Sequence, residues 1–133
     1  MTPCQYCPVS PFERLLAWQH CHRLAILTYR VTAQFPKAEL YGITSQMRRA
    51  ASSAAATIAE GSAKRGRREF RRYLDMAVGS LAELEYFGIL ARDLGLFRKE
   101  DWDEFNRRST EAGRTTMGLY KAIARPEPSG RAI

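Results

Sequence analysis

The sequence predicts an all-α protein, an antiparallel up-and-down four-helix bundle. Three observations support this fold. Apolar residues recur at alternating steps of three and four in four separate segments, which is the spacing of one helical face. The connections between these segments are short, as they are between neighbouring helices of such bundles. No segment shows the apolar–polar alternation of a half-buried strand.

The first helix is expected from about Phe12 to Gln34. Pro36 ends it, because a proline disfavours helical geometry in the residue before it. Residues 1–11 are expected to form a flexible N-terminal arm. The predicted buried face consists of Ala17, Cys21, Leu24, Thr28, Val31 and Phe35.

The second helix is expected from about Thr44 to Glu60. It is unusually rich in alanine and serine, whose small side chains let neighbouring helices approach closely. Gly61 is expected to cap its C-terminus, because glycine readily adopts the left-handed conformation that ends many helices.

The third and fourth helices have the longest periodic patterns. The third is expected from about Arg67 to Leu94, and Gly95 ends it. The fourth is expected from about Glu100 to Ala124, with acidic residues in its first turn, where the helix dipole favours them. One bundle domain therefore spans residues 12–124. Residues 125–133 are rich in proline and polar residues and are expected to be disordered.

Composition narrows the class of protein. A chain of 133 residues is long enough for one core, and a net charge of +7 favours polyanionic partners. No apolar run reaches the roughly 18 residues of a membrane-spanning helix, and no secretory signal is expected. Three cysteines do not form a disulfide framework in a chain of this length, so the expected compartment is a reducing cytoplasm.

Basic residues cluster at the predicted start of the third helix. The positive end of the helix dipole lies there, so each is unfavourable by a few tenths of a kcal/mol. On an ideal helix the four arginines after Gly66 span about 140° and face away from the core. They could hold a phosphate group, or they could form a solvated face that pairs with acids of a neighbouring subunit. The candidate nucleic-acid-binding residues are Lys64, Arg65, Arg67, Arg68, Arg71 and Arg72.

A second charged group lies on the alanine-rich helix. Arg48, Arg49 and Glu60 are expected to form a structural ion pair between helices, which fixes register more than it stabilises the fold. The alternative interpretation is an intersubunit or ligand site.

The evidence for a metal site or a catalytic site is weak. Cys4 and Cys7 form a C-x2-C motif, and His20 follows after twelve residues, as in zinc fingers. His22 is only two residues further on, and such positions point about 200° apart on a helix. Neither histidine has the glutamate three residues earlier that di-iron bundles use. No metal, cofactor, small-molecule substrate or catalytic residue is therefore assigned.

Four segments of the chain form a recognisable set: WQHCHRLAILTY (Trp18–Tyr29), FPKAELYGITSQMRRAASS (Phe35–Ser53), IAEG (Ile58–Gly61) and GSLAELEY (Gly79–Tyr86). They resemble the family of small four-helix bundle proteins related to those encoded in intervening sequences of bacterial 23S ribosomal RNA genes. The family pattern around the second helix usually reads like SIPANIAEG. Here Ala55 and Thr57 replace the usual proline and asparagine, which bears on local helix geometry and not on the fold.

The resemblance implies a non-enzymatic bundle of undefined role that forms closed rings, with a homopentamer as the expected assembly. More distantly similar bundles are accessory variability proteins of retroelements, where they bind RNA and a reverse transcriptase. Two hypotheses follow: a self-assembling structural or interaction module, and an RNA-binding accessory protein. Both predict an oligomer, which is also favoured by large residues in excess of one bundle's needs. These residues are Trp18, Tyr29, Tyr86, Phe87, Leu96 and Phe97.

Overall fold

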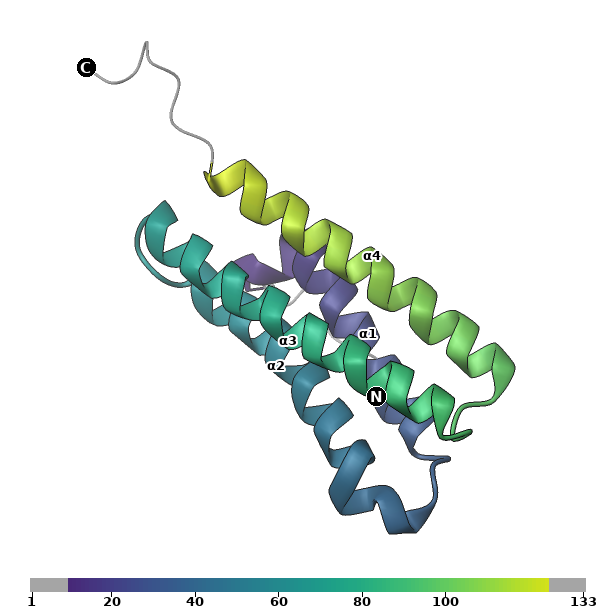
Figure 1. Cartoon of the computed structure of the whole chain (residues 1–133). Coiled ribbons are helices and arrows are strands. Elements are labelled where there is room, and N and C mark those ends of the chain that lie inside the picture. Colours follow the sequence, from purple (N-terminus) through teal and green to yellow (C-terminus); the bar gives the residue numbers. More distant parts are fainter. Residues whose placement is uncertain (1–9, 125–133) are drawn as a thin grey trace, which may run out of the picture.

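The computed structural model describes residues 10–124 and confirms the four predicted helices (Figure 1). The described residues contain no strand. Almost all of the predicted arm, and the whole predicted tail, lie outside these residues. The helices are α1 (Leu16–Thr32), α2 (Ser45–Ser62), α3 (Arg67–Asp93) and α4 (Lys99–Ala124).

The helix boundaries differ from prediction at both ends of α1. Pro11–Arg14 form a separate 3₁₀ turn, because the extended backbone of Leu15 (ψ 125°) interrupts the helix. After α1, a 3₁₀ turn at Lys37–Glu39 leads into a wide π turn at Leu40–Thr44. Within that turn Gly42 has non-helical angles (φ −112°, ψ −114°), which set the direction in which the chain enters α2.

The two glycines that were expected to end helices behave differently. Gly95 ends α3 as predicted: its φ is +76°, and the Leu96 N–H donates to the Ala91 carbonyl at 3.0 Å. The expectation for Gly61 is wrong, because α2 continues through it to Ser62. Gly61 is buried against α3, where a Cβ would lie 2.5 Å from the Tyr73 Cβ. It is needed for the close approach of two helices.

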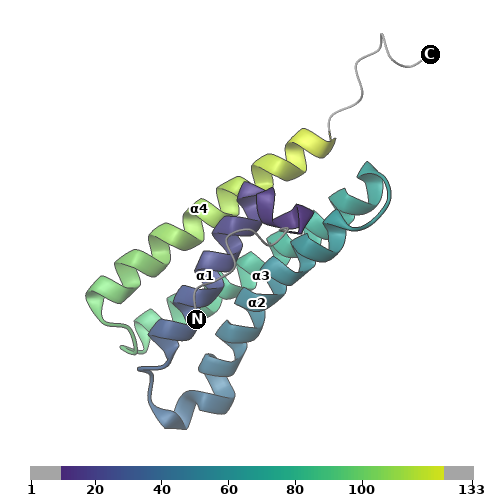
Figure 2. The ribbon, with the colours of Figure 1, turned by 180° about the vertical axis from the view of Figure 1, so that it is seen from behind.

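The neighbouring helices run antiparallel (Figures 1 and 2). On α2 and α3, Ser53 contacts Ser80 and Gly61 contacts Tyr73, so residue numbers rise on one helix as they fall on the other. The same pattern relates α1 to α4, where Cys21 contacts Thr116 and Arg30 contacts Glu104. Each helix packs on the next in sequence, and α1 closes the bundle against α4.

The core follows the predicted faces. The predicted face of α1 is buried from Ala17 to Phe35, and on α3 Leu74, Ala77 and Leu84 are fully buried. Cys21 is a free thiol in this core, and burial raises its pKa to about 11. No helix within residues 10–124 is long and apolar enough to span a membrane.

The large residues that suggested an oligomer divide into two groups. Trp18, Phe87, Leu96 and Phe97 pack against the core of their own bundle, so they are no evidence for an interface. Tyr29 and Tyr86 stay 48% and 57% exposed. Of these six residues, Tyr29 and Tyr86 are therefore the two that are available to contact another subunit.

Candidate nucleic-acid and assembly surfaces

The basic cluster lies at one end of the bundle, where α2 ends, α3 begins and α4 ends (Figure 1). Lys64 and Arg65 are exposed in the α2–α3 connection. Gly66, the residue before α3, has φ +83°, which lets the chain turn sharply into the helix. No side chain caps the start of α3. The first backbone N–H groups of α3 therefore add partial positive charge to the cluster.

Arg67 is exposed, as the sequence predicted, but its side chain is bound to the end of α4. Its guanidinium donates to the carbonyl oxygens of Ile123 (3.0 Å) and Ala122 (3.3 Å), in the last turn of α4. These carbonyls lack partners within α4, and they form the negative end of its dipole. Arg67 thus binds the end of α4 to the start of α3, which gives one arginine of the cluster a structural function.

Arg72 is also held by its own helix. Its guanidinium pairs with Glu69 at 3.2 Å and lies 5.0 Å from the centre of the Tyr73 ring. The hydrogen bond from Arg72 lowers the pKa of Glu69. An anion bound by Arg72 would therefore have to compete with this carboxylate.

Arg65, Arg68 and Arg71 make no hydrogen bond or ion pair with any residue in the range 10–124. Two of them line an open depression of about 470 Å³, here called the basic hollow. Arginine forks of this kind match the oxygens of phosphate, and a tyrosine ring offers a stacking surface. The basic hollow is lined by Arg68, Glu69, Arg71, Arg72, Asp75 and Tyr120.

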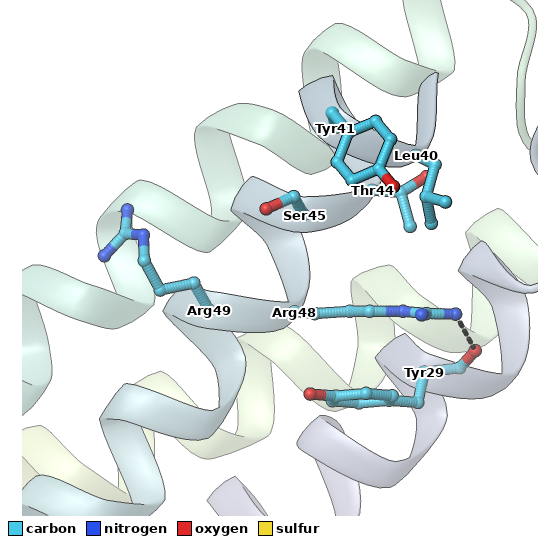
Figure 3. A pocket seen from close by; sticks show the side chains of 7 residues that line it. All are labelled: Tyr29, Leu40, Tyr41, Thr44, Ser45, Arg48 and Arg49. Atoms are coloured by element: carbon cyan, nitrogen blue, oxygen red, sulfur yellow. Dashed lines mark hydrogen bonds between the residues drawn. The ribbon is translucent and has the colours of Figure 1, made fainter. Parts of the chain in front are cut away.

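A second depression lies at the opposite end of α2 (Figure 3). This Tyr–Arg hollow has a volume of about 400 Å³ and is lined by Tyr29, Leu40, Tyr41, Thr44, Ser45, Arg48 and Arg49. The Arg48 guanidinium lies 4.7 Å from the centre of the Tyr29 ring (Figure 3). It donates to the Tyr29 carbonyl (3.3 Å) and to the buried Thr32 hydroxyl (2.9 Å). Arg48 thus fastens the end of α1 to the start of α2.

Of the three residues that were expected to form ion pairs between helices, Arg49 does so: it pairs with Glu83 on α3. Arg48 has the hydrogen-bond partners on α1 just described. Glu60 is exposed at the far end of α2, about 17 Å from Arg49 at 1.5 Å per residue. Its carboxylate has no hydrogen bond or ion pair with any described residue. The two arginines thus connect α2 to its neighbouring helices, whereas Glu60 does not.

The histidines do not form a metal site with described residues. The His20 Nδ1 lies 2.8 Å from Glu111 Oε1, although not in hydrogen-bond geometry, and His22 stacks on Trp18. Within residues 10–124, no three His, Cys, Asp or Glu side chains are placed to share a metal ion. Cys4 and Cys7 lie outside the described residues.

Comparison with known proteins identifies the family. The family described as 23S rRNA-intervening sequence protein matches residues 13–118. A solved structure of similar fold is a protein of unknown function from the S23 ribosomal protein family of Bacteroides thetaiotaomicron, with 20% identity and a TM-score of 0.71. The match covers 80% of this chain and 99% of that one, and at this identity it shows the fold alone. No curated protein matches the chain. Because the family match covers most of its length, the chain belongs to the 23S rRNA-intervening sequence protein family.

Proposed function

We propose that this protein is a non-enzymatic interaction module whose working form is a closed ring of identical subunits. The observation that carries this proposal is the apolar surface left exposed by a complete bundle. Tyr86 and Ile89, three residues apart on one face of α3, are 57% and 36% exposed, although the core of the bundle is closed without them. Exposed apolar residues that gather on one element mark interaction surfaces.

The expected ring is a homopentamer, as the family resemblance implies. A cytoplasmic location is part of the proposal and is supported by the unpaired buried thiol of Cys21. Within residues 10–124, the groups whose pKa values shift are the core thiol of Cys21 and one surface ion pair, Glu69 with Arg72. These are structural groups, so the proposal includes no catalysis.

Light scattering coupled to size-exclusion chromatography tests this proposal. At micromolar concentration we expect a mass near five times the 15.1 kDa chain, which is about 75 kDa. A dilution series shows whether the assembly is reversible. A mass of 15.1 kDa throughout the series would refute the proposal.

The second candidate function is binding of RNA at the basic hollow. It is favoured by Arg68 and Arg71, which line the hollow without a partner among the described residues. RNA affinity should fall steeply with ionic strength, because arginine–phosphate contacts release counterions. Replacing Arg68 and Arg71 with glutamine should abolish binding while the assembly persists. Arg72 stays intact because it is paired with Glu69. Arg67 is left intact in this variant because it binds α4.

A matched control removes the same charge elsewhere. Arg107 and Arg114 are exposed and have no ion pair or side-chain hydrogen bond among the described residues, so replacing both with glutamine removes equal charge away from the hollow. The control should retain most of the RNA affinity. Equal losses in both variants, or no RNA binding by the parent at low salt, would contradict this second function.

A further inference from the structure

Helices α2 and α3 each carry a second regular face that points away from the core. On both helices the exposed residues recur at steps of three and four, as a packed helical face requires. The outer face of α2 consists of Ser45, Arg49, Ser52, Ala56 and Glu60. The outer face of α3 consists of Arg72, Asp75, Gly79, Ala82, Tyr86 and Ile89.

Gly79 has no explanation within the chain. Gly61 and Gly88 are needed inside the bundle, because a Cβ at either would collide with Tyr73 or Phe105. A Cβ at Gly79 would meet no atom within 4 Å, as at Gly113 and Gly118 on α4. Gly79 differs from those two in lying on the regular outer face of α3 described above. Glycine in the middle of a helix lowers helix stability. A close neighbour from outside the chain would account for its presence on this face.

We infer that the outer face of α3 docks on the outer face of α2 of a second copy of this chain. This inference rests on the proposed function, since it names the surfaces through which the ring assembles. The two faces differ, so the contact is head-to-tail, and a head-to-tail contact can repeat from copy to copy. Because α2 and α3 are neighbouring helices, successive contacts turn in one direction, as closure into a ring requires (Figure 1).

The level of the contact follows from the fold. If the ring axis runs along the bundle, all copies lie at the same height, and a neighbour's α2 meets α3 at the level of the chain's own α2. Inside the chain Ser53 contacts Ser80 and Arg49 contacts Glu83. The same level places Ser52 opposite Ala82 of the next copy. It also places Ala56 opposite Gly79, and pairs of small residues permit a close approach.

The charges agree with this alignment. It places Glu60 of one copy near Arg72 of the next, and Arg49 near Glu85. Glu60 and Glu85 have no ion-pair partner among the described residues of their own chain. Arg72 and Arg49 already pair with Glu69 and Glu83 of their own chain, so each would be shared between two acids. Asp75 also lies near Glu60, but Arg68, Arg71 and Arg72 keep this end of α3 positive. Complementary charge at both ends of the contact favours this alignment over a shifted one.

A pair of glycine variants tests the contact. Gly79→Leu places a large side chain on the proposed interface, whereas Gly118→Leu places it on an equally open, exposed site of α4. Neither should unfold the bundle, which circular dichroism can confirm. At a concentration where the parent and Gly118→Leu assemble, Gly79→Leu should be monomeric by light scattering. A monomeric parent would refute the proposed function, and an assembled Gly79→Leu would refute only this inference.

Charge reversal tests the alignment. Glu60→Arg and Arg72→Glu should each raise the dissociation constant of the assembly about tenfold. The double variant should recover most of that loss, because the pair is restored with opposite polarity. A double variant that assembles no better than the weaker single variant would overturn the pairing of Glu60 with Arg72.

Discussion

The inner and outer faces of α2 and α3 both contain glycine, but different contacts account for it. On the inner faces, Gly61 and Gly88 are fixed by their own chain, because any larger residue would collide with Tyr73 or Phe105. On the outer face, a Cβ added at Gly79 would meet no atom within 4 Å. The small residues on the inner faces are therefore required by packing between helices of one chain. On the outer face, we relate a small residue to packing against a neighbouring copy.

The largest effect is expected from removing the partner of an inner glycine. Phe105 is 1% exposed and packs on Gly88. Phe105→Ala should lower the free energy of unfolding by about 3–5 kcal/mol, because it leaves a cavity in the core. Urea denaturation measures this change. A loss below about 1 kcal/mol would show that the inner face is not tightly packed.

A smaller loss of stability is expected when the inner glycine, Gly88, is itself replaced by a larger residue. Gly88→Ala should lower the free energy of unfolding by about 1–3 kcal/mol, since its Cβ would lie 2.4 Å from the Phe105 ring. In the Phe105→Ala background the same change should be neutral or stabilising, because the collision is gone and alanine favours the helix. A double-mutant cycle measures this coupling. Additive effects would contradict the close contact.

The same contrast applies to two arginines of the basic cluster. Arg67→Gln should lower the free energy of unfolding by about 0.5–1 kcal/mol, because the last turn of α4 loses the cation that binds its carbonyls. Arg71→Gln should change stability by less than about 0.5 kcal/mol, since Arg71 has no partner among the described residues. Denaturation of the two variants side by side tests the difference. Equal losses would show that the Arg67 contact with α4 does not stabilise the fold.

The smallest expected effect is a difference in stability between two variants of exposed helix glycines. Gly118→Ala should raise the free energy of unfolding by up to about 1 kcal/mol, because alanine favours the helix and its Cβ meets open space. Gly79→Ala should gain less than Gly118→Ala in the assembled protein, where a neighbouring copy approaches. Thermal melts above and below the assembly concentration measure the difference. Equal gains under both conditions would mean that no neighbour lies near Gly79.

The sequence predicted the inner faces well, because apolar spacing records burial directly. It misread Gly61, since a glycine near the end of a helix looks the same whether it caps the helix or packs against another. It predicted the exposure of Arg67 but not its contact with α4, because the partner carbonyls at Ala122 and Ile123 are distant in sequence. It predicted an ion pair between helices at Arg49 but not its partner, Glu83, because that choice depends on the level at which α2 and α3 meet.

The outer faces could not be recognised from the sequence for a related reason. Their spacing of three and four is present, but serine, arginine and glutamate occupy several of the positions, so a hydrophobic pattern does not reveal it. Only the exposure of Tyr86 and the open space around Gly79 show that the face is regular and unoccupied by the chain itself.

Disulfide cross-linking between two variants tests the central claim most directly. Both carry Cys4→Ser and Cys7→Ser and keep the buried Cys21; one adds Ser52→Cys and the other Ala82→Cys. After mixing, reassembly and oxidation, we expect covalent dimers in the mixture and none in either variant alone. Their formation would place α2 of one copy against α3 of the next. Dimers of Ala82→Cys alone would show a two-fold contact between α3 helices, and an assembled mixture without dimers would show that these faces do not meet; either result would contradict the account.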